Sequence, residues 1–303
     1  MMNRTVKTNS LYPLCVGVWD GPLDLDHPHL RLHIDRKKLR SLFLEPLREG
    51  RGETNALVTL EQKAKKVDFQ SEDSFHATAV AGIILGRENS PWLKNVSLFP
   101  IIGRIGREKT DEPALPLEEI SWSRIYLHLS RREQKAESLL SSFDQRRMQV
   151  INHYIKKANL KIVNLSTSIF EADAKELRSH LKNSQDRKAN PFPVTQLVHL
   201  MRKARLEFYK TIIVNNPQTI FVISAGNENT NLNSYQNFKT PNMIVVGNIN
   251  KKNLRKCPAS NFGSRFVDVG AHGTKILTLR PESPEVNYCF SGTSASAPLI
   301  THL

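Results

Sequence analysis

Cysteine is scarce in this chain, and long apolar runs are missing from it. The 303 residues include three cysteines, Cys15, Cys257 and Cys289. An odd number of widely spaced cysteines predicts neither a disulfide framework nor a zinc motif, and it is typical of a reducing compartment. No stretch approaches 18 consecutive apolar residues, and no apolar run precedes Pro13, so neither a membrane span nor a secretory signal is expected. We therefore expect a cytoplasmic protein, or one exported without a cleaved signal peptide.

Acidic residues are also in short supply, because 29 Asp and Glu stand against 43 Lys and Arg, which gives a net charge of +14. Such a charge favours contact with an acidic surface, which could be nucleic acid, anionic lipid or an acidic protein. The sequence has no helix-turn-helix, zinc-finger or aromatic-basic RNA signature, so specific nucleic-acid binding is not expected. A solvated basic surface is the simpler interpretation, and an acidic protein partner is the alternative.

Short apolar runs alternate with amphipathic stretches along the chain. Buried strands are predicted at 14–19, 56–60, 96–102, 161–166, 220–224, 243–247 and 266–270. Helices are predicted near 36–47, 73–86, 115–140, 144–157, 195–214 and 295–303. This alternation indicates an α/β fold with a mostly parallel sheet and right-handed crossovers. We expect residues 1–303 to form a single domain, with polar helical insertions near 104–143 and 170–195.

Small residues surround a serine near the end of the chain, in the run F-S-G-T-S-A-S-A-P over residues 290–298. A nucleophilic serine needs room beside it for a substrate carbonyl, and it gains if its own N–H points at the oxyanion. With Thr293 or Ser294 as a helix cap, Ser294 would lie in the positive field of the helix N-terminus. A small-residue turn that enters a helix is the alternative interpretation.

Three other polar residues stand at the ends of predicted elements. Asp20 ends the first strand, His76 lies in the first turn of a small-residue helix capped by Asp73 or Ser74, and Asn227 follows the strand at 220–224. A carboxylate can hold a histidine in one tautomer, and an uncharged side-chain amide is a good oxyanion donor. Taken singly, these residues could equally start a turn, fill a half-buried position or adopt a left-handed backbone.

The D-L-D-H-P-H run at 24–29 also gathers carboxylates and histidines. Its residues are crowded around a proline and lack the i, i+4 spacing of helical metal ligands. We therefore do not expect a metal site in this run.

The chain order Asp, His, Asn, Ser is the order found in subtilisin, and the local segments resemble the subtilase family of subtilisin-like serine peptidases (S8). H-A-T-A-V-A-G from His76 is similar to the family's H-G-T-x-V-A-G, and G-T-S-A-S-A-P from Gly292 is similar to its serine segment. S-A-G-N-E-N around Asn227 resembles the oxyanion segment. S-N-F-G and D-V-G-A-H-G, at 260–263 and 268–273, resemble the run before the nucleophile. The resemblance spans about residue 14 to the end.

This resemblance implies a subtilisin-like three-layer α/β/α fold that is truncated after the nucleophile helix begins, so that the C-terminal part of the usual domain is missing. It implies an endopeptidase in which Ser294 attacks the peptide bond and His76 acts as the base. Asp20 would orient His76, and Asn227 would bind the oxyanion. Substrate would add as a strand beside a four-residue segment, made of Leu165, Ser166, Thr167 and Ser168.

Departures from the family pattern leave a second hypothesis open. Gly21-Pro22 follows Asp20 where the family has Thr or Ser and then Gly, Ala77 replaces a glycine, and Ser168 stands at a usual glycine, which would narrow the specificity pocket. The alternative is therefore a catalytically inactive subtilase-like binding protein. No cofactor is expected to be required. Family members often bind structural calcium, but the segment at 87–91 is short for a calcium loop. Peptides or proteins are the expected partners.

Overall fold

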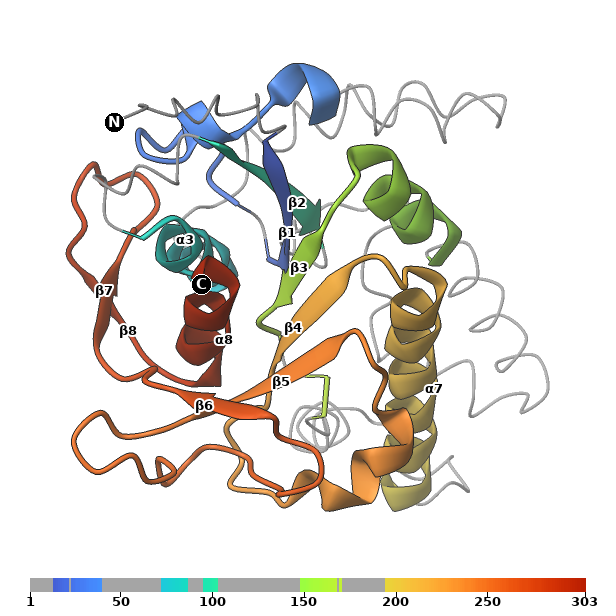
Figure 1. Cartoon of the computed structure of the whole chain (residues 1–303). Helices are drawn as coiled ribbons and strands as arrows, with labels where there is room; N and C mark the ends of the chain where they lie inside the picture. Colours follow the sequence, from blue (N-terminus) through green and yellow to red (C-terminus); the bar gives the residue numbers. More distant parts are fainter. Residues whose placement is uncertain are drawn as a thin grey trace, which may run out of the picture.

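A six-stranded parallel sheet forms the centre of the molecule, as Figure 1 shows for the computed structural model. Its strands lie side by side in the order β2 (Val96–Ile102), β1 (Leu14–Asp20), β3 (Ile162–Leu165), β4 (Ile220–Ser224), β5 (Met243–Asn248) and β6 (Val269–Ala271). The structure describes residues 13–21, 23–39, 72–86, 95–102, 148–167, 169–170 and 194–303. The predicted α/β class with a mostly parallel sheet is confirmed. The strand expected at 56–60 and most of both expected insertions lie outside the described residues.

Helices cover both faces of this sheet and make it the middle of three layers. Figure 1 shows α3 (Glu72–Leu85) and α8 (Thr293–His302) on one face, and α7 (Val194–Asn215) with the helix at 148–158 on the other. Strands buried from both sides read as continuous apolar runs, because neither face meets water. Six of the seven residues of β1 are buried in this way.

The middle of α3 is built from small residues because it packs closely against its neighbours. Ala77, Ala79 and Ala81 are fully buried. A Cβ on Gly82 would lie 2.5 Å from the Thr278 hydroxyl oxygen, so only glycine allows this contact without movement. The helix begins at Glu72, so Asp73 and Ser74 lie inside it and the predicted caps at those two positions are wrong.

Three elements near the end of the chain differ from the sequence prediction. The strand expected at 266–270 is shorter and later, at Val269–Ala271, because the amides of Phe266 and Val267 turn back to the Gly263 carbonyl. A hairpin of β7 (Ile276–Thr278) and β8 (Tyr288–Phe290) was not predicted, since three-residue strands carry too little periodicity to recognise. Helix α8 begins at Thr293 with Gly292 as its N-cap and no side-chain cap, so the predicted Thr or Ser cap is wrong.

The order of the strands reverses at β1. The chain passes from β1 to β2 on one side and then returns to place β3 on the other side. In open parallel sheets, ligands bind outside the carboxyl ends of the strands at such a switch point. Asp20 is the last residue of β1, and Ser166 directly follows β3. The topology therefore predicts a site at the same edge of the sheet that the sequence motifs indicate.

Candidate active site

Asp20 and His76 form a hydrogen-bonded pair at the switch point. His76 Nδ1 lies 2.8 Å from both carboxylate oxygens of Asp20. Asp20 is 2 % exposed, and its Oδ1 also accepts the N–H of Gly21 at 2.7 Å. Because the carboxylate accepts, the imidazole carries its proton on Nδ1 and leaves Nε2 able to act as an acceptor.

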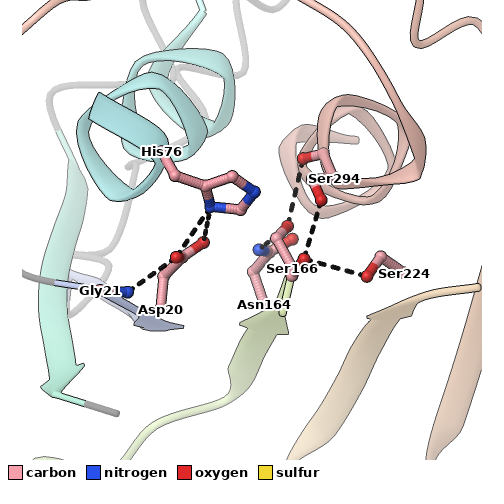
Figure 2. A network of polar contacts seen from close by, with 7 residues as sticks. All are labelled: Asp20, Gly21, His76, Asn164, Ser166, Ser224 and Ser294. Atoms are coloured by element: carbon pink, nitrogen blue, oxygen red, sulfur yellow. Dashed lines mark hydrogen bonds and ion pairs between the residues drawn. The ribbon is translucent and has the colours of Figure 1, made fainter. Parts of the chain in front are cut away.

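Ser294 lies in the first turn of α8, across from this pair. Figure 2 shows His76 between Asp20 and Ser294, with the ring directed toward the serine. The Ser294 hydroxyl is buried and donates to the backbone carbonyl of Ser166 at 2.9 Å. The Ser224 hydroxyl donates to the same carbonyl at 3.1 Å. The structure thus brings together the three residues that the sequence singled out as a triad, with the hydroxyl hydrogen-bonded to the segment that directly follows β3.

A buried polar network fixes α8 against β3 behind the serine. The amide of Asn164 donates to the Ser166 hydroxyl at 2.8 Å, and that hydroxyl donates to the Ser294 carbonyl at 3.2 Å. Thr301, two turns along α8, donates to the Asn164 side-chain oxygen at 2.9 Å. Sequence reasoning missed Asn164 and Thr301. The available signal was one polar residue within the otherwise apolar strand I-V-N-L.

Asn227 follows β4 and contacts Thr293, the residue before the serine. Its side-chain oxygen accepts the N–H of Thr293 at 3.0 Å and the Thr293 hydroxyl at 3.3 Å. These two donors settle which end of the amide is oxygen. Gly292 has a φ of +125°, and a Cβ there would lie 3.3 Å from the Asn227 oxygen. The amide therefore packs against a position that only glycine leaves open.

A second asparagine positions the backbone that enters α8. The side chain of Asn248 both donates to the carbonyl of Gly273 and accepts its N–H, at 3.3 and 2.9 Å. The Gly273 carbonyl in turn accepts the N–H of Gly292 at 2.8 Å. A Cβ on Gly273 would lie 2.4 Å from the Gly292 carbonyl oxygen, so this contact requires glycine. The end of β5 thus reaches the nucleophile segment through two hydrogen-bonded steps.

The expected substrate segment is largely enclosed at its beginning. Leu165 is fully buried and pairs with β1 on one side and β4 on the other, so its backbone offers no edge for a peptide. The expectation for Leu165 as a pairing residue is therefore corrected. Ser166 is buried, but its carbonyl faces the Ser294 hydroxyl, and Thr167 is half-buried. Ser168 lies outside the described residues.

Aromatic rings pack beside the imidazole. The Phe290 ring meets His76 edge-on, with centroids 5.1 Å apart. Tyr288 stacks on Phe290 and also contacts Phe75, whose ring carries the Arg280 guanidinium 5.0 Å from its centroid. These contacts limit rotation of the His76 ring. Sequence reasoning did not find them, because they depend on the unpredicted β7–β8 hairpin.

The side chains of the acidic and histidine-rich run after Asp20 accept hydrogen bonds from backbone N–H groups. Nδ1 of buried His27 accepts the N–H of His29 at 3.2 Å, and Asp24 accepts the N–H groups of Asp26 and Glu282. Burial lowers the pKa of His27 below its ordinary value, although the nearby Asp24 carboxylate acts in the opposite direction. Among the His, Cys, Asp and Glu side chains of the described ranges, no three gather as a metal ion would require. No helix within those ranges has the length and apolarity to cross a membrane.

Comparison with known proteins places these features in a family. An alkaline proteinase of Hapsidospora chrysogena is 36% identical over 80 residues, and alkaline protease 1 of Aspergillus flavus is 39% identical over 82 residues. These matches cover 26% and 27% of this chain but only 19% and 20% of those relatives. A cold-adapted subtilisin-like serine proteinase of known structure aligns with 96% of this chain and 73% of its own, at 15% identity and a TM-score of 0.49. The profile of the subtilase family matches residues 14–303, and the chain therefore belongs to the subtilase family.

Proposed function

We propose that this chain is a serine endopeptidase that uses Asp20, His76 and Ser294 as its catalytic triad. The observation that carries the proposal is the buried Asp20 carboxylate, which holds Nδ1 of His76 while the ring faces Ser294. An oriented imidazole next to a serine hydroxyl is the arrangement that acyl transfer to serine needs. Membership of the subtilase family supports the same chemistry.

In this mechanism Ser294 Oγ attacks the scissile carbonyl while Nε2 of His76 takes its proton. His76 then donates that proton to the leaving amine, and Asp20 stabilises the intermediate imidazolium. The hydroxyl now donates to the Ser166 carbonyl, so it must exchange this acceptor for His76 before attack. A substrate N–H that bonds to the Ser166 carbonyl would favour the exchange, because it would occupy the oxygen that the hydroxyl now uses. Residues 166–168 are the proposed segment for such strand addition.

The oxyanion hole of this proposal combines the Asn227 amide with the backbone N–H of Ser294. The first N–H groups of a helix have no acceptor within it, so that of Ser294, the second residue of α8, is suited to an oxyanion. The Asn227 oxygen accepts from Thr293, so the amide nitrogen is the donor that this proposal assigns to the oxyanion.

The test replaces Asn227 with alanine. Losing a side-chain oxyanion donor lowers turnover by about 10²–10³, so Asn227→Ala should be a folded and nearly silent enzyme. The measurement is kcat on a chromogenic peptide, with circular dichroism to check folding. Retention of more than about a tenth of the wild-type turnover would make the oxyanion assignment wrong.

A non-catalytic binding protein is the competing hypothesis. The observation that favours it is the Ser294 hydroxyl, which donates to the Ser166 carbonyl and is buried. Both hypotheses use peptides or proteins as partners, and only the first predicts that Ser294 reacts with an electrophile. An acidic partner for the basic surface stays a prediction.

A further inference from the structure

We infer that Asn261 is a positioning residue that sets the oxyanion donor Asn227, an assignment that rests on the proposed function. Asn261 belongs to the S-N-F-G run, for which the proposed mechanism has no role. It follows β5 by thirteen positions in the sequence, is 2 % exposed, and lies against the segment that contains Asn227.

The carboxamide of Asn261 uses its full hydrogen-bonding capacity on this one segment. Its oxygen accepts the N–H groups of Glu228 and Thr230, at 3.1 and 2.8 Å. Its nitrogen donates to the Ala225 carbonyl at 2.8 Å and to Oε2 of Glu228 at 2.7 Å. An asparagine side chain offers two acceptor sites and two donors, and all four are used here. The backbone N–H of Asn261 adds a bond to the Gly226 carbonyl at 2.9 Å.

Glu228 connects Asn261 to Asn227 itself through hydrogen bonds. One carboxylate oxygen, Oε2, accepts from Asn261, and the other, Oε1, accepts the backbone N–H of Asn227 at 3.1 Å. Asn261 thus holds the residues before and after Asn227 directly, and it holds Asn227 through Glu228. Hydrogen bonds to a charged acceptor are stronger than neutral ones, so the relay is well suited to fixing a loop at the protein surface.

Asn227 is exposed, so packing does little to fix it, and its position depends on the hydrogen bonds of the loop at 225–230. Its side chain is tied to Thr293, and its backbone follows Gly226, whose φ is +97°. An oxyanion donor works only within about 2.7–3.1 Å of the developing charge. Small shifts of the 225–230 backbone would therefore move the donor away from the oxyanion and lower the reaction rate.

The test compares Asn261→Ala in two backgrounds, the wild-type chain and Asn227→Ala. If Asn261 acts through Asn227, its loss lowers kcat about tenfold or more in the first background, up to the 10²–10³ of the donor itself, with little change in KM. In the second background it has almost no further effect, because the donor is already gone. Titration with a fluorophosphonate counts the active sites, so that kcat refers to folded enzyme.

A matched control is Asn242→Ala. Asn242 also satisfies several backbone groups, since its amide donates to the carbonyls of Ile213, Asn216 and Thr219 at 3.0–3.1 Å. It directly precedes β5, at the end of the sheet away from the site. Asn242→Ala should lower stability and leave kcat per active site unchanged.

A rescue keeps the inference testable if Asn261→Ala fails to fold. Asn261→Asp would set a carboxylate against Glu228 and the Ala225 carbonyl, and it should lower kcat strongly. Adding Glu228→Gln supplies a donor where the two carboxylates met, so the double variant should regain part of the lost turnover, with Asn227 intact. No recovery in the double variant would contradict the inference.

The experiments distinguish a failure of the proposed function from a failure of the role assigned to Asn261. A wild-type chain that does not react with the fluorophosphonate overturns the proposed function and this inference with it. A reactive wild-type chain in which Asn261→Ala lowers kcat by the same factor in both backgrounds leaves the peptidase proposal intact. That result would overturn the positioning role of Asn261 alone.

Discussion

Replacing Asp20 with asparagine tests how the His76 tautomer is set. Oδ1 of Asp20 accepts the Gly21 N–H at 2.7 Å, and both oxygens face Nδ1 of His76 at 2.8 Å. In Asp20→Asn the amide oxygen must stay with the Gly21 N–H, because a turned amide would oppose two donors. Its NH₂ group then donates to Nδ1, and the imidazole proton moves to Nε2. The atom that should accept the serine proton would then carry a proton of its own.

The loss should be large although the change is small in size. A triad aspartate changed to asparagine lowers kcat about 10⁴-fold through the wrong tautomer, which equals about 5.4 kcal/mol of transition-state stabilisation at 1.36 kcal/mol per tenfold. The assay is kcat on a chromogenic peptide, and proton NMR of the imidazole N–H reports the tautomer independently.

Asp24→Asn is the matched control for this experiment. Asp24 is also a buried carboxylate and lies close to Asp20 in the sequence, but its Oδ1 accepts the N–H of Asp26 and its Oδ2 that of Glu282. An amide keeps one of these bonds and loses the other without changing the His76 tautomer, so Asp24→Asn affects stability. It should keep most of the wild-type rate. If Asp20→Asn kept more than about a tenth of wild-type kcat, where a 10⁴-fold loss is expected, the tautomer argument would be refuted.

Two further predictions concern packing and pH. Gly273→Ala should lower the free energy of unfolding by about 1–3 kcal/mol and also reduce kcat, because its Cβ would lie 2.4 Å from the Gly292 carbonyl oxygen. Urea unfolding and peptide hydrolysis measure the two effects. The control is Gly17→Ala, whose Cβ would contact the flexible Leu160 side chain and which should affect stability alone. His27 has a lowered pKa, so the unfolded chain takes up its proton first as pH falls, and its contribution to stability is complete above about pH 6.5 and declines below it. Unfolding midpoints between pH 7.5 and 5.5 should therefore fall more steeply in wild type than in His27→Asn, and equal slopes would exclude a role for His27.

The sequence was sufficient for the central strands of the sheet because they are buried on both faces. Runs such as I-F-V-I are apolar without interruption, and the predicted bounds of β4 and β2 agree with the structure. The β7–β8 hairpin was beyond reach, since its three-residue strands are stabilised by contacts with α3 that lie far away in the sequence. Burial pattern therefore predicts the core, and short strands at its border need tertiary information.

The site was predictable where the chemistry demands particular residues. Asp20, His76 and Ser294 stand in recognisable small-residue segments, and the structure brings them together. The residues that hold them are different, because Asn164 and Asn261 act through buried hydrogen bonds to groups that lie far away in the sequence. The sequence can mark such residues as unusual, but only the packed structure identifies the groups that they hold.

The proposed peptidase activity depends above all on whether Ser294 is an activated nucleophile. Wild-type protein and Ser294→Ala would be treated with a biotinylated fluorophosphonate, after circular dichroism has shown that both are folded. We expect the wild type to be labelled, the label to map to Ser294, and Ser294→Ala to stay unlabelled. A folded wild-type chain that takes no label would contradict the proposed peptidase and favour the non-catalytic binding protein.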